Sequence, residues 1–392
     1  MRVLLLAPEP FYQERGTPIA VSLILRALSA RGDQVDALVY HEGAEVSYPG
    51  VTIHRLPRIP FVRGVRPGFS LKKLVCDAVF WVAAVRLALR RPRHDVIHAV
   101  EESVFIARFI RALTGTPYLY DMDSFMSDQM TDRYPALRLL RGGMRWIEGR
   151  AIGQAEVVVP VCDALADVAT RYRARAITVL RDISLLSEGQ AAPAGQPTVR
   201  ETLGVEGPLV MYVGNLERYQ GIDLLLESFA IAHRRVPQAR LVVIGGPPAA
   251  IESYTQQARQ MGLDGMVRFV GPRPVAALRR YLEAADVLVS PRLAGGNTPM
   301  KIYSYLDAGR AVLATKLPTH TQVLTDEVAL LADPTPPAMA DGLVRLLKEP
   351  ELRRRLGRAG QALVAQRHTY SVFQRTLQDL YQRLEQRRNA RA

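Results

Sequence analysis

The sequence has few of the residues that stabilise secreted proteins. It has two cysteines, Cys76 and Cys162, in 392 residues. A secreted protein of this size usually carries more, so the pair favours a reducing cytoplasm over a disulfide framework. The opening apolar run of residues 1–7 is followed at once by two prolines and a glutamate, and no small-residue cleavage site follows. We therefore interpret this run as a buried first strand rather than a signal peptide.

Acidic residues are also scarce relative to basic ones. The chain has 38 Asp and Glu against 51 Lys and Arg, which gives a formal charge of +13. Nucleic acid, an anionic membrane surface and phosphorylated substrates are all partners that such a charge would attract. No aromatic-interleaved RNA motif, zinc-finger spacing or helix-turn-helix stands out, so nucleic acid is the weakest of the three.

Apolar runs long enough to cross a bilayer are absent. The best candidate, residues 71–93, is interrupted by Asp77 and Arg86 and falls short of the roughly 20 apolar residues that a span needs. It is either a core helix packed on a sheet or a helix whose basic rim lies on anionic lipid. The positive charge of the whole chain and the arginines from Arg138 to Arg150 favour the second interpretation, contact with anionic lipid.

Short apolar runs alternate with amphipathic stretches along the whole chain, which is typical of parallel βα units. Residues 187–198 are rich in small residues and proline, lack apolar periodicity and predict a linker. The pattern predicts two doubly wound α/β domains, 1–186 and 199–370, with a final helix at 371–392 that packs back on the first domain. Seven strands are expected before the linker, within 2–8, 34–40, 50–56, 95–100, 117–123, 156–162 and 176–182. Five are expected after it, within 208–215, 239–246, 266–271, 286–291 and 311–315.

Residues 286–315 carry the clearest chemical signal. A buried strand ends at Ser290, a glycine-containing loop follows, and Thr298 with Pro299 is a good helix start. Lys301 would then lie in the first turn, where its charge opposes the helix dipole unless it meets an anion. The segment is either a phosphate site or an ordinary turn with a solvated lysine.

The same segment resembles the donor-binding segment of the large retaining GT-B group that includes glycogen synthases, sucrose synthases and bacterial cell-surface glycosyltransferases. Members often have Pro-x-Lys-x-x-Glu-Tyr-x-x-x-Gly-x-Pro-Val-x-Ala-Thr here. The matching residues are Pro299, Lys301, Tyr305, Gly309, Val312, Ala314 and Thr315. Residues 211–229 resemble the loop that opens the donor domain, and 94–102, 117–124 and 155–168 resemble first-domain segments, so the similarity covers most of the chain.

This resemblance implies a family 4-like glycosyltransferase with two Rossmann-like domains facing across a cleft. The first domain would take the acceptor and the second the nucleotide-sugar donor. The expected reaction retains the anomeric configuration, needs no metal or other cofactor, and serves cell-envelope polysaccharide biosynthesis with a glycan or lipid-linked acceptor. The expected location is the cytoplasm, with peripheral association at the inner face of the membrane.

Two departures from the group alter the expected donor site. The Glu-x7-Glu pair falls on Gly296 and Ser304, so only a weak ribose contact from Ser304 is expected. The Arg and Lys of the first loop are replaced by Asn215 and Gln220. The diphosphate is then expected to be bound by Lys301 and the helix N-terminus, together with Arg218 or Arg292. The expected donor-binding residues are Gly16, Thr17, Gly214, Asn215, Arg218, Gln220, Arg292, Gly296, Asn297, Thr298 and Ser304, with Lys301 as a catalytic cation.

The first domain is expected to supply carboxylates. Asp123 matches a position where the group often has a histidine near the reacting carbon, and it would stabilise positive charge there or bind sugar hydroxyls. The alternative is that Asp123 caps the following helix. Glu101 and Glu102 follow a strand and are alternative bases or acceptor ligands, whereas His98 is expected to be a core residue.

Three alternatives remain at this point. The missing carboxylate pair fits a catalytically silent GT-B partner or scaffold protein. Another GT-B enzyme, such as an epimerase or a pyridoxal-type phosphorylase, would share the fold. A basic membrane- or nucleic-acid-binding protein could also reuse it, since function depends on the site and not on the fold.

Overall fold

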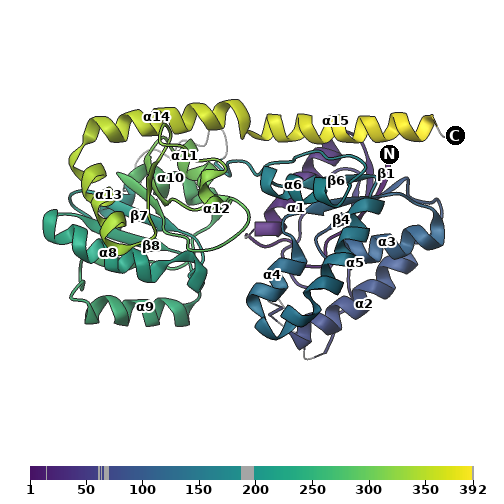
Figure 1. Ribbon diagram of the computed structural model, residues 1–392, viewed down its shortest axis with the longest axis horizontal. Helices are drawn as coiled ribbons and strands as arrows, with labels where there is room; N and C mark the ends of the chain where they lie inside the picture. The colour runs from purple at the N-terminus through teal and green to yellow at the C-terminus, as the bar shows by residue number, and fades with distance from the viewer. Residues whose placement is uncertain (15, 61, 63, 66–69, 187–197, 391–392) are drawn as a thin grey trace. The chain divides into compact units, whose positions relative to one another are not determined.

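A computed structural model describes residues 1–14, 16–60, 62, 64–65, 70–186 and 198–390. The predicted linker at 187–198 therefore lies outside the described residues, apart from Thr198. The chain divides into two units (Figure 1): Met1–Arg181 with Ser371–Ala392, and Asp182–Tyr370. Residues 182–186 belong to the second unit, not to the first as predicted, because the Leu185 N–H donates to Ser304 of that unit.

The first unit is built on a parallel sheet of six strands in the order β3-β2-β1-β4-β5-β6. The strands are β1 (Arg2–Leu6), β2 (Gln34–Val39), β3 (Val51–Arg55), β4 (Val96–Val100), β5 (Tyr118–Met122) and β6 (Val157–Pro160). The helices are α1 (Gly16–Ala30), α2 (Leu71–Ala88), α3 (Ser103–Thr114), α4 (Met126–Arg133), η1 (Pro135–Leu140), α5 (Arg141–Gln154), α6 (Asp163–Arg171) and α15 (Tyr370–Asn389).

Alternate strand residues of the first sheet bury opposite faces. Leu4 and Leu6 of β1 share one core with side chains of α2, α3 and α5, whereas Val3 and Leu5 face the other side. Both faces are covered, as expected for a parallel sheet. Figure 1 shows α2, α3 and α5 together on one side of this sheet.

The second unit repeats the design with a parallel sheet in the order β12-β11-β10-β7-β8-β9. Its strands are β7 (Leu209–Val213), β8 (Arg240–Ile244), β9 (Val267–Phe269), β10 (Val287–Ser290), β11 (Ala311–Thr315) and β12 (Leu330–Ala332). Its helices are α7 (Val199–Thr202), η2 (Arg218–Gln220), α8 (Ile222–Arg235), α9 (Pro248–Gln260), η3 (Val275–Ala277), α10 (Leu278–Ala284), α11 (Lys301–Asp307), α12 (Pro318–Thr321), α13 (Pro336–Lys348) and α14 (Pro350–Arg367).

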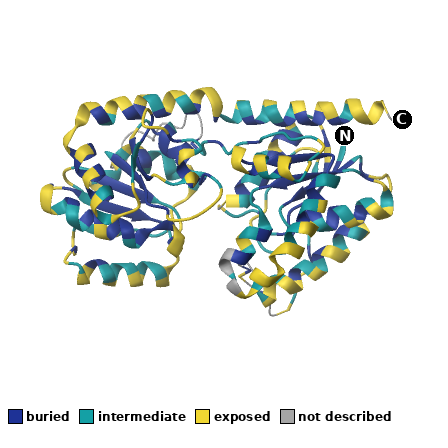
Figure 2. Ribbon diagram, in the orientation of Figure 1, coloured by how far each residue is buried: buried dark blue, intermediate teal, exposed yellow. Residues whose placement is uncertain are grey.

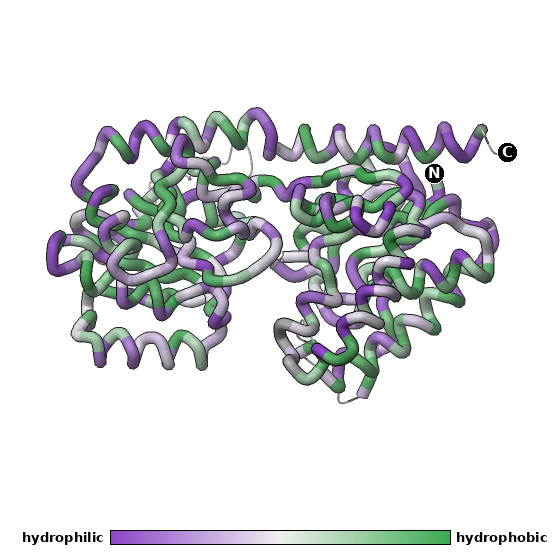
Figure 3. The backbone as a smooth tube through the Cα atoms, viewed as in Figure 1, coloured by the Kyte–Doolittle hydropathy of each residue, from purple (hydrophilic) through white to green (hydrophobic). Residues whose placement is uncertain are grey.

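Two cores flank the second sheet. One joins the strands to α8 and α13, and the other joins them to α10, α11 and α14. Figures 2 and 3 show the strands of each unit as its buried, hydrophobic interior. The predicted α/β class with two doubly wound sheets is thus confirmed.

Two strand predictions were wrong. Residues 176–182 form no strand of the first sheet. They contact β6 through one bridge, between Val158 and Ile177, and through a backbone hydrogen bond from Leu180 to the Pro160 carbonyl. In the second unit β12 was missed, because its three residues are too short to show a period.

The strand order identifies where each sheet can bind a ligand. In a doubly wound sheet, ligands lie beyond the carboxyl ends of the strands at which the connections change direction. In the first unit these strands are β1 and β4, and in the second they are β7 and β10.

Candidate active site

A pair of cations, Arg292 and Lys301, follows β10 in the second unit and lies against residues of β7 and of the segment after it. Lys301, the first residue of α11, donates from Nζ to Gln220 Oε1 at 2.8 Å and to the Tyr212 hydroxyl at 2.9 Å. Its ammonium also lies 4.1 Å from the centroid of the Tyr212 ring. Gly214, just after β7, leaves room for this arrangement, since a Cβ there would come within 2.6 Å of Lys301 Nζ.

The second cation is Arg292, which follows β10 and is only 8% exposed. Its Nε donates to the Ala294 carbonyl at 2.6 Å, and its guanidinium lies 5.3 Å from the Tyr219 ring centroid. It makes longer contacts with Asn297, at 3.5 Å to the carbonyl and 3.4 Å to Oδ1.

These two cations have no carboxylate partner among the described residues: every contact given above is neutral. Burial lowers the pKa of Lys301 well below its usual range, and the nearby charge of Arg292 lowers it further. Burial also lowers the pKa of Arg292. Two desolvated like charges without a counter-ion cost free energy, and a bound anion would remove that cost.

Thr298 adds an unused hydroxyl to this region. The side chain is 3% exposed and its Oγ1 has no hydrogen-bond partner among the described residues. Buried polar atoms are nearly always paired, so this one is available to a ligand. The neighbouring backbone is held in place by Thr319, which donates to the Asn297 carbonyl, and by Gln322, which donates to the Gly296 carbonyl.

The predicted helix start at Thr298 was wrong. The helix begins at Lys301, and Met300 occupies the N-cap position without a side-chain cap. The Thr298 hydroxyl has no hydrogen-bond partner among the described residues, so it accepts no N–H of α11. The first turn of α11 is therefore uncapped, and the Lys301 side chain contacts Tyr212 of β7.

Two further predicted donor residues have structural partners. Ser304 is buried, and its Oγ accepts the Leu185 N–H at 3.0 Å, so this hydroxyl already has one partner within the unit. Gln220 is buried and accepts from Lys301, which makes it a positioning residue for the cation. Asn215 and Arg218 are exposed beside it.

Sequence reasoning missed a group of buried side chains behind the cations. The Tyr305 hydroxyl accepts the Val213 N–H at 2.7 Å and donates to the Val213 carbonyl at 3.0 Å, which fixes the end of β7. His320 bonds Ser290 Oγ at 2.9 Å and the Thr315 carbonyl at 2.9 Å. Burial lowers the pKa of His320 to about 4, so this imidazole is neutral near pH 7.

In the first unit, carboxylates gather at the end of β4 and β5. Glu101 follows β4 in the left-handed backbone region, with φ 50°, and accepts the Ser124 hydroxyl at 3.0 Å. Burial raises the pKa of Glu101 well above its usual range, and the charges of Asp123 and Glu102 raise it further. The two predicted carboxylates, Glu101 and Asp123, are therefore close enough to interact.

The helix-cap interpretation of Asp123 was wrong. The N-cap position of α4 is Phe125. The first N–H groups of α4 are bound instead by Glu148 of α5, which accepts from Met126 at 2.9 Å and Ser127 at 2.8 Å.

The remaining first-unit predictions have mixed outcomes. His98 is buried and bonds the Tyr381 hydroxyl at 2.8 Å and Asp121 at 3.3 Å, which confirms it as a core residue. Glu102 pairs with Lys73 of α2. Helix α1 begins at Gly16, so Thr17 lies in its first turn rather than at the N-cap. Gly16 is exposed, and a Cβ there would meet nothing within 4 Å.

Two family models match the chain in succession. The glycosyl transferase 4-like domain matches residues 15–181, and the glycosyl transferases group 1 model matches residues 198–363. A D-inositol 3-phosphate glycosyltransferase of Corynebacterium diphtheriae is 26% identical over 93% of this chain and 89% of its own length. The enzyme of the same name from Corynebacterium efficiens is 29% identical to this chain. That similarity covers 60% of this chain and 57% of the length of the enzyme.

Solved structures show the same fold. A sucrose-phosphate synthase of Thermosynechococcus elongatus has a TM-score of 0.81 and 21% identity, with 98% of each chain covered. Anabaena HepE in complex with UDP-glucose has a TM-score of 0.75 and 15% identity, with 97% of this chain and 99% of that one covered.

Proposed function

This chain belongs to the glycosyltransferases of the GT-B fold, and we propose that it transfers a sugar from a nucleoside diphosphate sugar with retention of anomeric configuration. The observation that carries the proposal is the pair of cations Lys301 and Arg292, which lack a carboxylate partner among the described residues at the β7 and β10 ends. A diphosphate is the anion class that such a pair suits, because it presents several charged oxygens to both cations at once.

The chemistry of this cluster supports a nucleoside diphosphate sugar as the donor. Lys301 and Arg292 would bind the diphosphate oxygens, and the Thr298 hydroxyl would donate a further hydrogen bond. The solved complexes of Anabaena HepE with UDP and with UDP-glucose support a donor of this class. Gln220 and Tyr212 would orient Lys301, and Gly214 would let the ligand approach the backbone.

In the proposed reaction the bond between the anomeric carbon and the diphosphate oxygen breaks, and an acceptor hydroxyl oxygen bonds to the same face of that carbon. The acceptor proton passes to the departing diphosphate, so no external base is required. The cations stabilise the charge that develops on the leaving group, which is the largest contribution expected in such a site. We assign Asp123 and Glu101 to sugar or acceptor hydroxyl groups.

For the acceptor we propose a broad class of compounds and not a single one. Two of the relatives are named for an inositol compound, as a D-inositol 3-phosphate glycosyltransferase and as a phosphatidyl-myo-inositol mannosyltransferase. A glycan or lipid-linked acceptor in the cell envelope suits the excess of positive charge on this chain.

A thermal-shift screen with nucleoside diphosphates tests the donor assignment. A ligand that binds only the native state raises the melting temperature, by an amount that grows with its concentration relative to Kd. At least one nucleoside diphosphate should raise it, and the matching nucleoside, without phosphates, should not. Equal shifts from nucleoside and nucleoside diphosphate would contradict a site built for the diphosphate.

A further inference from the structure

Most of the large apolar side chains that reach the surface lie on one helical layer of the first unit. Of the fourteen exposed large apolar residues in the described chain, all but Tyr219 and Leu293 lie on α2, α3, η1 and α5, or directly after α2. They are Leu71, Leu74, Val75, Trp81, Val82, Leu89, Phe109, Leu113, Leu139, Leu140, Trp146 and Ile147. A cluster of this kind on one face marks an interaction surface rather than scattered exposure.

Helix α2 is apolar on two opposite faces. Its inner residues, such as Cys76, Phe80 and Ala84, lie in the core. Leu71, Leu74, Val75, Val82 and Leu89 recur at helical spacing on the outer face, and all are exposed (Figure 2). A surface helix in a monomer normally turns a polar face outward, so the apolar outer face of α2 is a candidate interaction surface.

Both tryptophans of the chain lie on this layer. Trp81 of α2 contacts Phe109 of α3, with ring centroids 5.8 Å apart. Trp146 of α5 is 62% exposed, and the Arg150 guanidinium lies 4.8 Å from its ring centroid. Tryptophan beside arginine is typical of the boundary between lipid tails and headgroups, where an amphipathic ring and a cation are both accommodated.

The charges on the layer are strongly one-sided. Helices α2, α3, η1 and α5 together carry nine basic residues and two acidic ones, Asp77 and Glu148. Asp77 is neutralised by Lys73 at 3.1 Å, and Glu148 is buried and binds the start of α4. Two carboxylates beside these helices also pair with the layer: Asp128 of α4 with Arg141 and Arg145, and Glu102 with Lys73. The nine basic residues still outnumber these four carboxylates, so the net charge of the layer is positive.

We propose that this layer, hereafter the docking face, binds an anionic lipid surface with its helices lying in the headgroup region. None of the helices in the described part of the chain is long and apolar enough to span a bilayer. An apolar stripe with tryptophans and a basic rim matches a surface-bound helix layer. This proposal does not depend on the sugar chemistry of the second unit.

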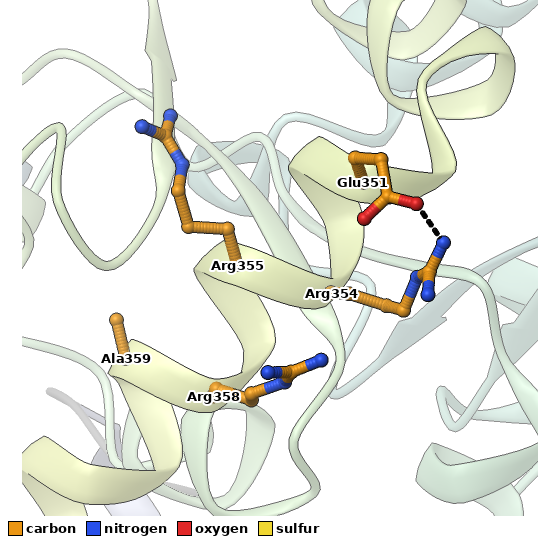
Figure 4. A pocket seen from close by; sticks show the side chains of 5 residues that line it. All are labelled: Glu351, Arg354, Arg355, Arg358 and Ala359. Atoms are coloured by element: carbon orange, nitrogen blue, oxygen red, sulfur yellow. Dashed lines mark hydrogen bonds and ion pairs between the residues drawn. The ribbon is translucent and has the colours of Figure 1, made fainter.

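A second basic surface of the chain serves as a control. Arg354, Arg355 and Arg358 of α14 line a depression of about 440 Å³ with Glu351 and Ala359 (Figure 4). Arg354 is paired with Glu351. This surface carries arginines without exposed large apolar side chains, so it tests whether charge alone would suffice for binding.

The test is co-sedimentation of the full chain with vesicles of phosphatidylglycerol and phosphatidylcholine, compared with phosphatidylcholine alone. The parent should bind the anionic vesicles preferentially. The double variant Leu74→Glu/Val82→Glu should lose at least about tenfold in partition coefficient, since apolar contact is replaced by repulsion. The control Arg355→Glu/Arg358→Glu changes more charge on α14 and should bind like the parent.

Fluorescence provides an independent readout, because both tryptophans belong to the docking face. Their emission should shift to shorter wavelength when anionic vesicles are added. Equal loss of binding in the two double variants, or no preference for anionic vesicles, would overturn the proposal. So would a concentration-dependent dimer of the parent that Leu74→Glu/Val82→Glu abolishes, since the occupant would then be a second copy of the chain.

Discussion

Replacement of Lys301 by methionine removes the ammonium while keeping most of the side-chain length. In the free protein Nζ makes two neutral hydrogen bonds, to Gln220 Oε1 and to the Tyr212 hydroxyl. If the ammonium meets a diphosphate oxygen, the lost contact is charge-assisted and contributes about 1.5–3 kcal/mol. The expected loss in affinity for a nucleoside diphosphate is therefore about 10- to 100-fold.

The effect of the same change on stability should be small. Removing the cation relieves its burial beside Arg292, whereas Gln220 Oε1 loses its donor. These effects are each about 1–3 kcal/mol and opposite in sign, so the melting temperature without ligand should move by no more than a few degrees. Loss of affinity without loss of stability distinguishes a binding residue from a structural one.

Titration calorimetry with the diphosphate and a melting curve without it are the two measurements. Lys316→Met is the matched control, because Lys316 is an exposed lysine that directly follows β11 in the same unit. It should bind the diphosphate like the parent. If Lys301→Met also binds within twofold of the parent, about 0.4 kcal/mol, Lys301 does not contact the ligand and the reasoning fails.

Four further predictions concern Lys301, Thr298, Asp123 and His320. Because burial and Arg292 lower the pKa of Lys301 in the free protein and an anion would raise it, diphosphate binding should take up a proton. Affinity should accordingly fall as pH rises above the free-state pKa, and calorimetry in buffers of different ionisation enthalpy would detect the proton. Thr298→Val should lower diphosphate affinity by about 1 kcal/mol with no loss of stability, since its hydroxyl has no partner to lose among the described residues; a lower melting temperature would contradict this. Asp123→Asn should lower turnover in single-turnover kinetics far more than diphosphate affinity, and equal losses would contradict its assignment to the sugar or acceptor. The pKa of His320 is lowered to about 4 from 6.5, so the unfolded chain binds more protons between these values and stability should fall as pH drops through that window. His320→Gln should show a shallower acid loss in pH-dependent denaturation, and an unchanged slope would exclude His320 as its source.

The alternation of apolar runs and amphipathic stretches was sufficient to predict two doubly wound units, because parallel strands buried on both faces leave a strong sequence signal. Two contacts between distant residues were not predictable. Glu148 binds the start of α4 from 21 residues further along the chain, so no local motif announces the cap. Ser304 accepts the Leu185 N–H across 119 residues, and only the folded unit shows that this hydroxyl is already used.

The candidate site was predictable only where local sequence determines it. Lys301 was found because its position in the chain predicted a cation near a strand end. Its true partners, Tyr212 and Gln220, come from another loop. The absence of a counter-ion for Arg292 and Lys301 among the described residues is a property of the packed unit, and composition alone could not show it.

Turnover of nucleoside diphosphate sugars is the most direct test of the central claim. The full chain would be incubated with a panel of these donors and a lipid extract as acceptor, and the anomeric proton of the first-formed product would be followed by nuclear magnetic resonance. We predict release of the nucleoside diphosphate and a product with the anomeric configuration of the donor. An inverted product would contradict the proposed mechanism. Binding of a donor without turnover of any sugar in the panel would identify a catalytically silent member of the fold.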